Sequence, residues 1–540
     1  MEEMEEMEEM GGNGHIQVPD VTQWGRIEIA FDSSKLYDNP IQEVALQVML
    51  TSPSGGLYHV LGFWDGARTW RVRFSPDEEG EWTYGTFCSD AENEGLHDRE
   101  GGFLCGPLRG GNRFDEHGPI QVSADKRHFI HTDETPFFWL ADTTWNGALL
   151  STDDEWQFYL SERKRQQFTV TQWVATQWRS APHGDIQGQV AFTGLEKIAI
   201  QPAFFRRMDA RVEAVYQAEL LSAPVMLWAN SGGEHPEVNP GMSLPEDQAI
   251  LLCEYMVARW GCYPVVWILG GDGDYREEKA ERWKTIGRAV FGKGVHAPVA
   301  MHAQGRHWLV EEFRSEGWTD VVGYQSGHGD GEETFDWIVN GPASKDWNTE
   351  PRQFYLNMEP AYENHVAYQS KKPHSDHSVR KAIYWSLLNA PTAGVTYGGH
   401  GVWGWDDGSG PPVDHPRTGT PLPWQDALVM PGAEQMVHLW DLFASIDWWR
   451  LVPDPNLLVE QPGEQAVGAH ILAARSEAGD LAVVYTPEGE AVHLKGLQNG
   501  MRGVWFDPRT GDPVSVVIVE GKESCRFESP GKGDWVLVLA

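Results

Sequence analysis

Two carboxylates each follow an apolar, β-like segment of the chain. Asp272 follows residues 267–271, which end in two glycines, and Glu359 follows residues 354–358 and precedes Pro360. A (β/α)8 barrel holds its chemistry on side chains at the carboxyl ends of its strands. Cleavage of a glycosidic bond needs two carboxyl groups, one protonated and one ionised. The pattern predicts such a pair, with Asp272 as the general acid/base and Glu359 as the nucleophile.

Other interpretations of these carboxylates stay open at this stage. Either one could cap a helix that follows it or pair with a nearby arginine. Asp274 and Glu363 each lie close in sequence to a member of the pair and could take over its role. The pairing of the two carboxylates on one scaffold is what favours catalysis over these structural roles.

The scaffold is predicted from the alternation of short apolar segments with longer amphipathic ones, which is typical of βα units around a parallel sheet. No phosphate-binding glycine loop follows any of these segments, so a closed barrel is favoured over an open doubly wound sheet. Thr152 and Glu155 have the spacing of a capping box and predict a helix over 153–165. The eight predicted strands are 137–141, 169–173, 224–228, 265–269, 298–301, 321–324, 354–357 and 394–397.

Further polar and aromatic side chains follow these strands and are predicted to bind substrate. Asp142 could instead be a structural cap, and the tryptophans could simply pack, although flat aromatic faces also stack on sugar rings. Three histidines, at 302, 328 and 400, could converge on a metal, but no HxH pair lies on the first strand, so we predict neither metal nor organic cofactor. The predicted substrate-binding residues are Asp142, Trp145, Trp178, His183, Asn230, His302, Tyr324, Gln325, His328, Tyr362, His400 and Trp403.

The rest of the chain divides into flanking units. Residues 15–112 alternate apolar and polar residues in short runs separated by turn signals, which predicts a β-sandwich, and the same pattern returns over 451–540. The barrel is predicted over 113–450. Residues 1–14 form an acidic, low-complexity leader. It lacks the pattern of a secretory signal, so we expect a cytoplasmic chain as it stands, or an exported one if a leader has been replaced.

Composition narrows the class of partner. The 42 Lys and Arg residues against 79 Asp and Glu residues give a net charge of −37, which disfavours nucleic acid and anionic membrane surfaces. No apolar run approaches the roughly 20 residues of a membrane span. The five cysteines show no CxxC spacing; Cys88 and Cys105 could pair, but buried free thiols are favoured. The 26 tryptophans suggest a carbohydrate partner, and the oligomeric state is left open.

The segments that carry the predicted site resemble the apiosidase-like catalytic domain of bacterial glycoside hydrolases. The resemblance covers about 114–446 and rests on residues 138–145 (FWLADTTW), 267–272 (WILGGD), 326–328 (SGH), 359–363 (EPAYE) and 394–403 (GVTYGGHGVW). It implies that Asp272 is the acid/base and Glu359 the nucleophile. The preceding region resembles the β-sandwich that commonly accompanies such barrels, and the last region resembles a module named for collagen binding that accompanies many carbohydrate enzymes.

The resemblance implies a glycoside hydrolase that acts on a plant or microbial polysaccharide or its side chains, with apiose as the implied sugar. The larger clan of retaining glycosidases has Asn-Glu at the end of strand four, whereas this chain has Gly-Gly-Asp, so its shorter carboxylate departs from that pattern. Retention is favoured. A noncatalytic carbohydrate-binding or adhesive protein and a metal-dependent barrel hydrolase are the alternatives.

Overall fold

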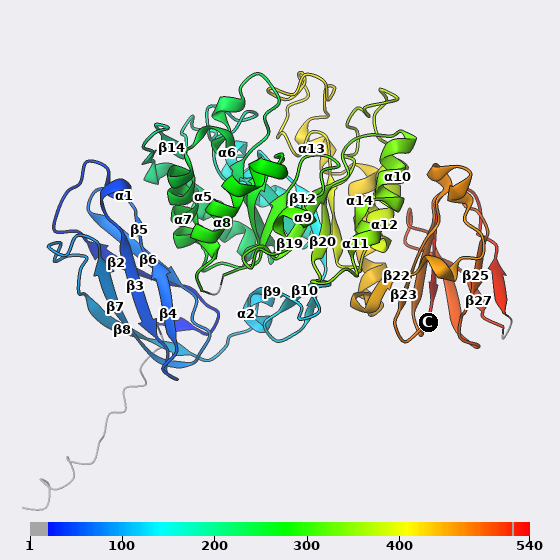
Figure 1. Ribbon diagram of the computed structural model, residues 1–540, viewed down its shortest axis with the longest axis horizontal. Coiled ribbons are helices and arrows are strands. Elements are labelled where there is room, and N and C mark those ends of the chain that lie inside the picture. Colours follow the sequence, from blue (N-terminus) through cyan, green and yellow to red (C-terminus); the bar gives the residue numbers. More distant parts are fainter. Residues whose placement is uncertain (1–19, 295, 521–522) are drawn as a thin grey trace, which may run out of the picture.

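The computed structural model describes residues 20–294, 296–520 and 523–540. A β-sheet domain, a (β/α)8 barrel and a second β-sheet domain follow one another along the long axis of the molecule, with the barrel in the middle (Figure 1). The predicted leader, 1–14, and the first residues of the predicted N-terminal sandwich, 15–19, lie outside the described residues. The fold class predicted from sequence is confirmed.

The N-terminal domain packs two sheets against each other. Alternation sets its core: in β3 the side chains of Leu46, Val48 and Leu50 are buried, while the residues between them are exposed. One sheet has the order β1 (Val21–Thr22), β8 (Glu100–Gly106), β7 (Gly80–Cys88), β3 (Leu46–Thr51) and β4 (Leu57–Leu61). The other has the order β2 (Ile27–Asp32), β6 (Thr69–Phe74) and β5 (Phe63–Trp64), and the short helix α1 spans Pro40–Glu43.

A short connecting unit leads from this domain into the barrel. It consists of α2 (Arg113–His117) and the antiparallel strands β9 (Ile120–Val122), β10 (Phe129–His131) and β11 (Pro136–Phe137). Phe129 is fully buried and packs edge-on against Phe354 at the start of a barrel strand, with ring centroids 4.7 Å apart. The connecting unit therefore covers the amino-terminal end of the barrel, opposite to the end where strand-end side chains meet.

The central sheet of the described chain consists of eight parallel strands, and each of the eight predicted segments overlaps one of them. The predicted bounds differ from the observed ones by no more than three residues. All five residues of most of these strands are buried, as expected of strands covered on both faces. In sheet order the strands are β20 (Phe354–Glu359), β19 (Val321–Gln325), β18 (Val299–His302), β17 (Trp267–Gly271), β16 (Leu221–Trp228), β13 (Val170–Val174), β12 (Trp139–Thr143) and β21 (Gly394–Gly398).

Helices and short elements surround this sheet. The helix predicted over 153–165 is confirmed as α4 (Asp153–Arg165), and its capping box is formed because Thr152 Oγ1 accepts from the Glu155 backbone at 3.2 Å while Glu155 accepts from the Thr152 backbone at 2.8 Å. The other elements are α3 (Gly147–Leu150), β14 (Phe192–Thr193), β15 (Ala199–Ile200), α5 (Pro202–Gln217), α6 (Pro240–Ser243), α7 (Glu246–Trp260), α8 (Ala280–Phe291), α9 (Val310–Phe313), α10 (Glu332–Asn340), α11 (Pro342–Asp346), α12 (Asp376–Leu388), α13 (Trp424–Ala427) and α14 (Pro431–Ala444).

The C-terminal domain packs directly against α12 and α14. Arg380 of α12 reaches Asp534 at 2.8 Å, and both side chains are almost fully buried. Tyr384 stacks on Tyr485 with ring centroids 4.8 Å apart. One sheet has the order β22 (Leu451–Pro453), β23 (Leu472–Ser476), β24 (Ala482–Thr486), β29 (Trp535–Leu539), β26 (Arg502–Phe506) and β27 (Pro513–Ile518), and a second sheet pairs β25 (Val492–Lys495) with β28 (Ser524–Phe527).

The structure also tests the predictions for the cysteines and for membrane spans. All five cysteines are free, and Cys88, Cys105, Cys253 and Cys262 are buried, which confirms the interpretation as buried thiols. Among the described residues, the helices include none that is both long and apolar enough to cross a membrane.

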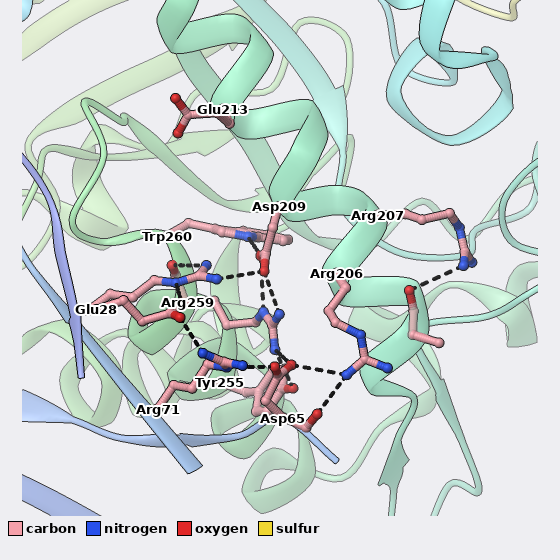
Figure 2. A network of polar contacts seen from close by, with 12 residues as sticks. Glu28, Asp65, Arg71, Arg206, Arg207, Asp209, Glu213, Tyr255, Arg259 and Trp260 are labelled. Carbon is pink, nitrogen blue, oxygen red and sulfur yellow. Dashed lines mark hydrogen bonds and ion pairs between the residues drawn. The ribbon is translucent and has the colours of Figure 1, made fainter. Parts of the chain in front are cut away.

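A network of charged side chains fixes the N-terminal domain on the barrel (Figure 2). Arg259 of α7 is fully buried; it donates to Asp65 of the N-terminal domain at 3.0 Å and to Asp209 of α5 at 3.0 Å. Arg73 of β6 also reaches Asp209, at 2.9 Å. Although burial alone raises the pKa of the Asp209 carboxyl, the two guanidinium groups outweigh it and lower that pKa. The interface therefore depends on charges that compensate one another out of water.

Replacing the central arginine should separate this buried network from ordinary surface pairs. Arg259→Met leaves Asp65 and Asp209 short of their shared partner, and we expect a loss of about 3–5 kcal/mol in the free energy of unfolding. Arg450→Met, the control, removes a solvent-exposed pair with Asp480 and should cost about 0–1 kcal/mol. Urea unfolding followed by circular dichroism measures both. An equal loss of unfolding free energy in the two variants would contradict a larger contribution from the buried network.

Candidate functional site

A cavity of about 330 Å³ opens at the carboxyl end of the barrel strands. This is the end at which (β/α)8 enzymes carry their active sites, and the volume suits a small ligand. Both predicted catalytic carboxylates, Asp272 and Glu359, line it. They come from β17 and β20, which are separated by β18 and β19 in the sheet order. The cavity therefore brings together two carboxyl groups from the ends of different strands.

Glu359 is the last residue of β20 and is held by donors on neighbouring strand ends. Gln325 Nε2 donates to its Oε1 at 2.5 Å, and His328 Nε2 lies 3.0 Å from the same oxygen. His302 Nε2 lies 3.3 Å from Oε2. Burial alone would raise the pKa of the Glu359 carboxyl, but the contacts with His302 and His328 outweigh it and lower that pKa. Glu359 is thus kept as a carboxylate.

Asp272 follows β17 directly, and the two glycines before it are needed for packing. A Cβ atom on Gly271 would lie 2.5 Å from a methyl group of Val225, and one on Gly270 would lie 2.7 Å from the Tyr275 hydroxyl oxygen. Asp272 itself has φ of 50°, a left-handed conformation that aspartate tolerates better than most residues. The backbone thereby turns out of the strand and brings the carboxyl group into the cavity.

The surroundings of the Asp272 carboxyl group differ from those of Glu359. Asn230 Nδ2 donates to Asp272 Oδ2, and the backbone N–H of Asp272 donates to His302 Nδ1 at 3.1 Å. Burial raises the pKa of Asp272, and the negative charge of Glu359 raises it further. One carboxyl group of the pair is therefore favoured as the acid and the other as the carboxylate, which is the division of roles that acid-assisted glycoside cleavage needs.

Tryptophan side chains form much of the cavity wall. Trp178 and Trp228 lie with ring centroids 4.4 Å apart, and Trp145 meets Trp228 edge-on at 5.4 Å. Trp178 is fixed because its Nε1 donates to Asn146 at 2.7 Å. Such flat apolar surfaces are suited to the C–H faces of sugar rings.

Most of the residues predicted to bind substrate are brought together at this cavity. His302 is fully buried between the Asp272 backbone and the Glu359 carboxylate rather than on the cavity surface. The predicted residues that line the cavity are Trp145, Trp178, Asn230, Gln325, His328, Tyr362 and Trp403.

Four predicted binding residues lie elsewhere. Asp142 points away from the cavity because side chains on a strand alternate between its two faces. It is fully buried behind the strands, where it accepts from Arg163 at 2.8 Å and from the Tyr159 hydroxyl at 2.8 Å. Tyr324 points outward and packs near Trp308 and Trp337. His400 supports the wall by accepting from Trp403 Nε1 at 3.1 Å, and His183 is exposed outside the cavity lining.

The alternative carboxylates also lie outside the cavity lining. Asp274 pairs with Arg276 at 2.8 Å and Lys279 at 2.6 Å, and these cations lower its pKa. Glu363 is buried and accepts from the Tyr397 hydroxyl at 2.7 Å and from the Gly432 backbone at 2.9 Å. Within the part of the chain that the structure describes, no group of three or more His, Cys, Asp or Glu side chains is arranged to hold a metal ion.

Several residues at the cavity escape detection by sequence reasoning. Arg179 directly follows Trp178, and Trp228 ends a predicted strand, so position alone could have indicated both. His415 and Thr418 come from the long loop after β21 and lie far from any strand end, so no local pattern marks them. The additional lining residues are Arg179, Trp228, Gln304, Gly305, His307, Gly327, His365, Tyr368, His415 and Thr418.

Comparisons with known proteins agree with this geometry. The family model "Apiosidase-like, catalytic domain" matches residues 123–450, a domain of unknown function (DUF5060) matches 20–89, and the model named "Putative collagen-binding domain of a collagenase" matches 452–540. No curated protein matches the chain in sequence.

Solved structures share the fold at low sequence identity. A glycoside hydrolase has a TM-score of 0.69 and 22% identity over 80% of this chain and 98% of its own. A glycoside hydrolase family 5 protein from Bacteroides vulgatus has a TM-score of 0.68 and 20% identity over 80% and 94%. A "putative glycoside hydrolase" from the same organism has a TM-score of 0.71 and 16% identity over 96% and 99%.

The catalytic-domain model covers more than half of the chain and all of the cavity-lining residues. Barrel, cavity and family agree, and the chain belongs to the apiosidase-like family of glycoside hydrolases.

Proposed function

We propose that this protein cleaves glycosidic bonds of a plant or microbial polysaccharide, or of its side chains, by a retaining mechanism that uses Asp272 and Glu359. One observation carries the proposal: the two carboxyl groups line one cavity, and their pKa values are shifted in opposite directions. Such a separation marks the acid and the carboxylate of a glycosidase. The family name supports apiose as the first sugar to test.

In the first half of the proposed reaction, Glu359 attacks the anomeric carbon of the bound sugar. The bond from that carbon to the leaving oxygen breaks, and Asp272 gives its proton to that oxygen, so a glycosyl ester on Glu359 and a free alcohol are formed. His302 and His328 stabilise the negative charge on Glu359 before attack. The Trp145, Trp178 and Trp228 rings line the cavity beside the two carboxyl groups.

In the second half, Asp272 acts as the base. It takes a proton from water, whose oxygen attacks the anomeric carbon and releases Glu359 as a carboxylate, so that both groups return to their starting states. The ester on Glu359 carries no charge, which removes the electrostatic effect that raises the pKa of Asp272. Asp272 is therefore a weaker acid in the free enzyme than in the intermediate, as its two roles require.

Other polar groups at the cavity are suited to bind the sugar. Arg179 is largely buried at the cavity wall, and its Nε makes no hydrogen bond to another group in the described residues. Its Nη2 contacts His415 Nε2, and no carboxylate of the described residues forms an ion pair with it, so its other N–H groups are free of competing anions when they donate to substrate oxygens. We expect Arg179→Gln to raise KM about tenfold or more with a smaller change in kcat, measured on any hydrolysed substrate. An unchanged KM would remove Arg179 from the binding surface.

Removal of either carboxylate should abolish most of the activity without unfolding the protein. We expect Asp272→Ala to lower kcat by about 10²–10⁴-fold on substrates with poor leaving groups, and Glu359→Ala to lower it by several orders of magnitude on all substrates. Asp274→Asn is the matched control, because this carboxylate pairs with surface cations outside the cavity lining. A control variant as inactive as Asp272→Ala would overturn the assignment.

Azide distinguishes the two roles. With Glu359→Ala, azide takes the place of the nucleophile and should give a glycosyl azide of inverted configuration. With Asp272→Ala, azide attacks the glycosyl ester and should give the retained product. NMR of the products decides the configuration, and the opposite pattern would exchange the two assignments.

The pH dependence follows from the same two shifts. Activity needs Glu359 ionised and Asp272 protonated, so kcat/KM should fall on the acid side as Glu359 gains a proton and on the alkaline side as Asp272 loses one. Because the pKa of Glu359 is lowered, the acid limb should lie below the ordinary pKa of a glutamate. Because the pKa of Asp272 is raised, the alkaline limb should lie above the ordinary pKa of an aspartate. With an activated aryl leaving group, Asp272→Asn should lose the alkaline limb. Its persistence in that variant would assign the limb to another group.

A screen of aryl glycosides and of pectic, arabinan and galactan oligosaccharides tests for hydrolysis and identifies the substrate class. Turnover of at least one compound, unchanged by a metal chelator, is the expected result. Binding without turnover across the panel would favour the noncatalytic, adhesive alternative, and loss of activity on chelation would favour a metal-dependent hydrolase.

A further inference from the structure

His302 lies at the end of β18, between the strands that carry the two carboxylates. Its side chain is fully buried and contacts both residues, Asp272 at the backbone and Glu359 at the carboxylate. The backbone N–H of Asp272 donates to Nδ1 at 3.1 Å, and Nε2 lies 3.3 Å from Glu359 Oε2. The Trp145 ring packs edge-on against the imidazole, with centroids 5.6 Å apart. The ring thus has little freedom to reorient.

These contacts determine where the imidazole carries its proton. Because Nδ1 accepts a hydrogen bond from the backbone, it cannot itself be protonated, and the proton of the neutral ring must sit on Nε2. Nε2 lies 3.3 Å from Glu359 Oε2. Within the described residues, neither atom makes a hydrogen bond of normal geometry, either with the other or with a third group. Catalytic contacts of this length are known to tighten when substrate is bound.

The hydrogen bond between the Asp272 backbone and His302 supports an unfavourable backbone conformation. Asp272 has positive φ, which L-residues adopt at an energetic cost, and the hydrogen bond to His302 Nδ1 holds its N–H in that conformation. The carboxyl group of Asp272 depends on this backbone orientation for its direction.

We propose that His302 is a positioning residue that acts on both members of the pair, by fixing the backbone of Asp272 through Nδ1 and by presenting Nε2–H to Glu359. This role rests on the proposed two-carboxylate reaction. The same imidazole then orients the Asp272 carboxyl group and favours the ionised form of Glu359. A substitution of His302 should therefore impair both the acid assistance by Asp272 and the ionisation of Glu359.

Two neighbours each act on a single member of the pair and serve as matched controls. Asn230 donates to Asp272, and Gln325 donates to Glu359. The titratable and charged groups around the pair come from several elements and include histidines, three tyrosines and an arginine. They are His302, His328, His415, Tyr275, Tyr362, Tyr368 and Arg179.

The test compares His302→Phe, His302→Gln, Asn230→Ala and Gln325→Leu in the full chain. Two readouts are measured: the pH of the acid limb of kcat/KM, and the ratio of kcat/KM between an activated aryl glycoside and one with a poor leaving group. We expect His302→Phe to move the acid limb to higher pH, because Glu359 loses a donor, and to increase the ratio by about 10²-fold, because the acid is misplaced. His302→Gln, whose amide can replace either contact, should recover part of both effects.

The controls should separate the two effects. Gln325→Leu should move the acid limb with little change in the ratio, and Asn230→Ala should change the ratio with little change in the acid limb. Circular dichroism and thermal unfolding establish that each variant is folded. A folded His302→Phe enzyme that shows only one of the two effects, or an equal loss on all substrates at an unchanged acid limb, would overturn the proposed coupling.

A readout that needs no activity keeps this inference distinct from the proposed function. In protein with ¹⁵N-labelled histidine, the His302 signal, assigned by its loss in His302→Phe, should show a protonated Nε2 and an unprotonated Nδ1. The opposite tautomer would overturn the positioning role even in an active glycosidase. Wild-type protein that binds the sugars of the panel without cleaving them would overturn the proposed function and, with it, the role of His302 in it.

Discussion

The proposed chemistry depends on two carboxyl groups that line one cavity. Neighbouring like charges disfavour one another's ionisation, which favours retention of a proton by one of the two groups. The surroundings decide which one. His302 at the end of β18 and His328 after β19 lie against the Glu359 carboxylate, whereas the Asp272 carboxyl group accepts from Asn230. The barrel, the glycines before Asp272 and the aromatic wall all serve to keep this asymmetric arrangement in place.

Much of this arrangement could be predicted from the sequence because it is local. Strand periodicity and length identify the eight strands, and the position just after a strand places Asp272 and Glu359 at one mouth. The direction of a side chain is harder to predict. Asp142 and Tyr324 lie on strands as expected, yet both point away from the cavity because alternate residues face opposite sides of the sheet. Arg179 and His415 reach the cavity from loops whose paths depend on contacts distant in sequence.

Buried ion pairs, in addition to apolar contacts, fix the two flanking domains to the barrel. Arg259 joins the N-terminal domain to α5 and α7, and Arg380 joins α12 to the C-terminal domain. Buried arginines with several acceptors give such interfaces a specific geometry. The barrel helices that these contacts hold, α5, α7 and α12, pack against the barrel strands β16 and β21. Sugar specificity, in contrast, is expected from the loops that carry Trp178, Arg179 and His415.

The central claim is that Glu359 attacks the sugar while Asp272 serves as the acid. The most direct measurement is mass spectrometry of the protein after reaction with a 2-deoxy-2-fluoro glycoside of a sugar that it hydrolyses, because such a compound slows the release of a glycosyl ester. The account predicts one added sugar per chain, on a peptide that contains Glu359. A label on another carboxylate, or an unlabelled chain that releases product of inverted configuration, would contradict it.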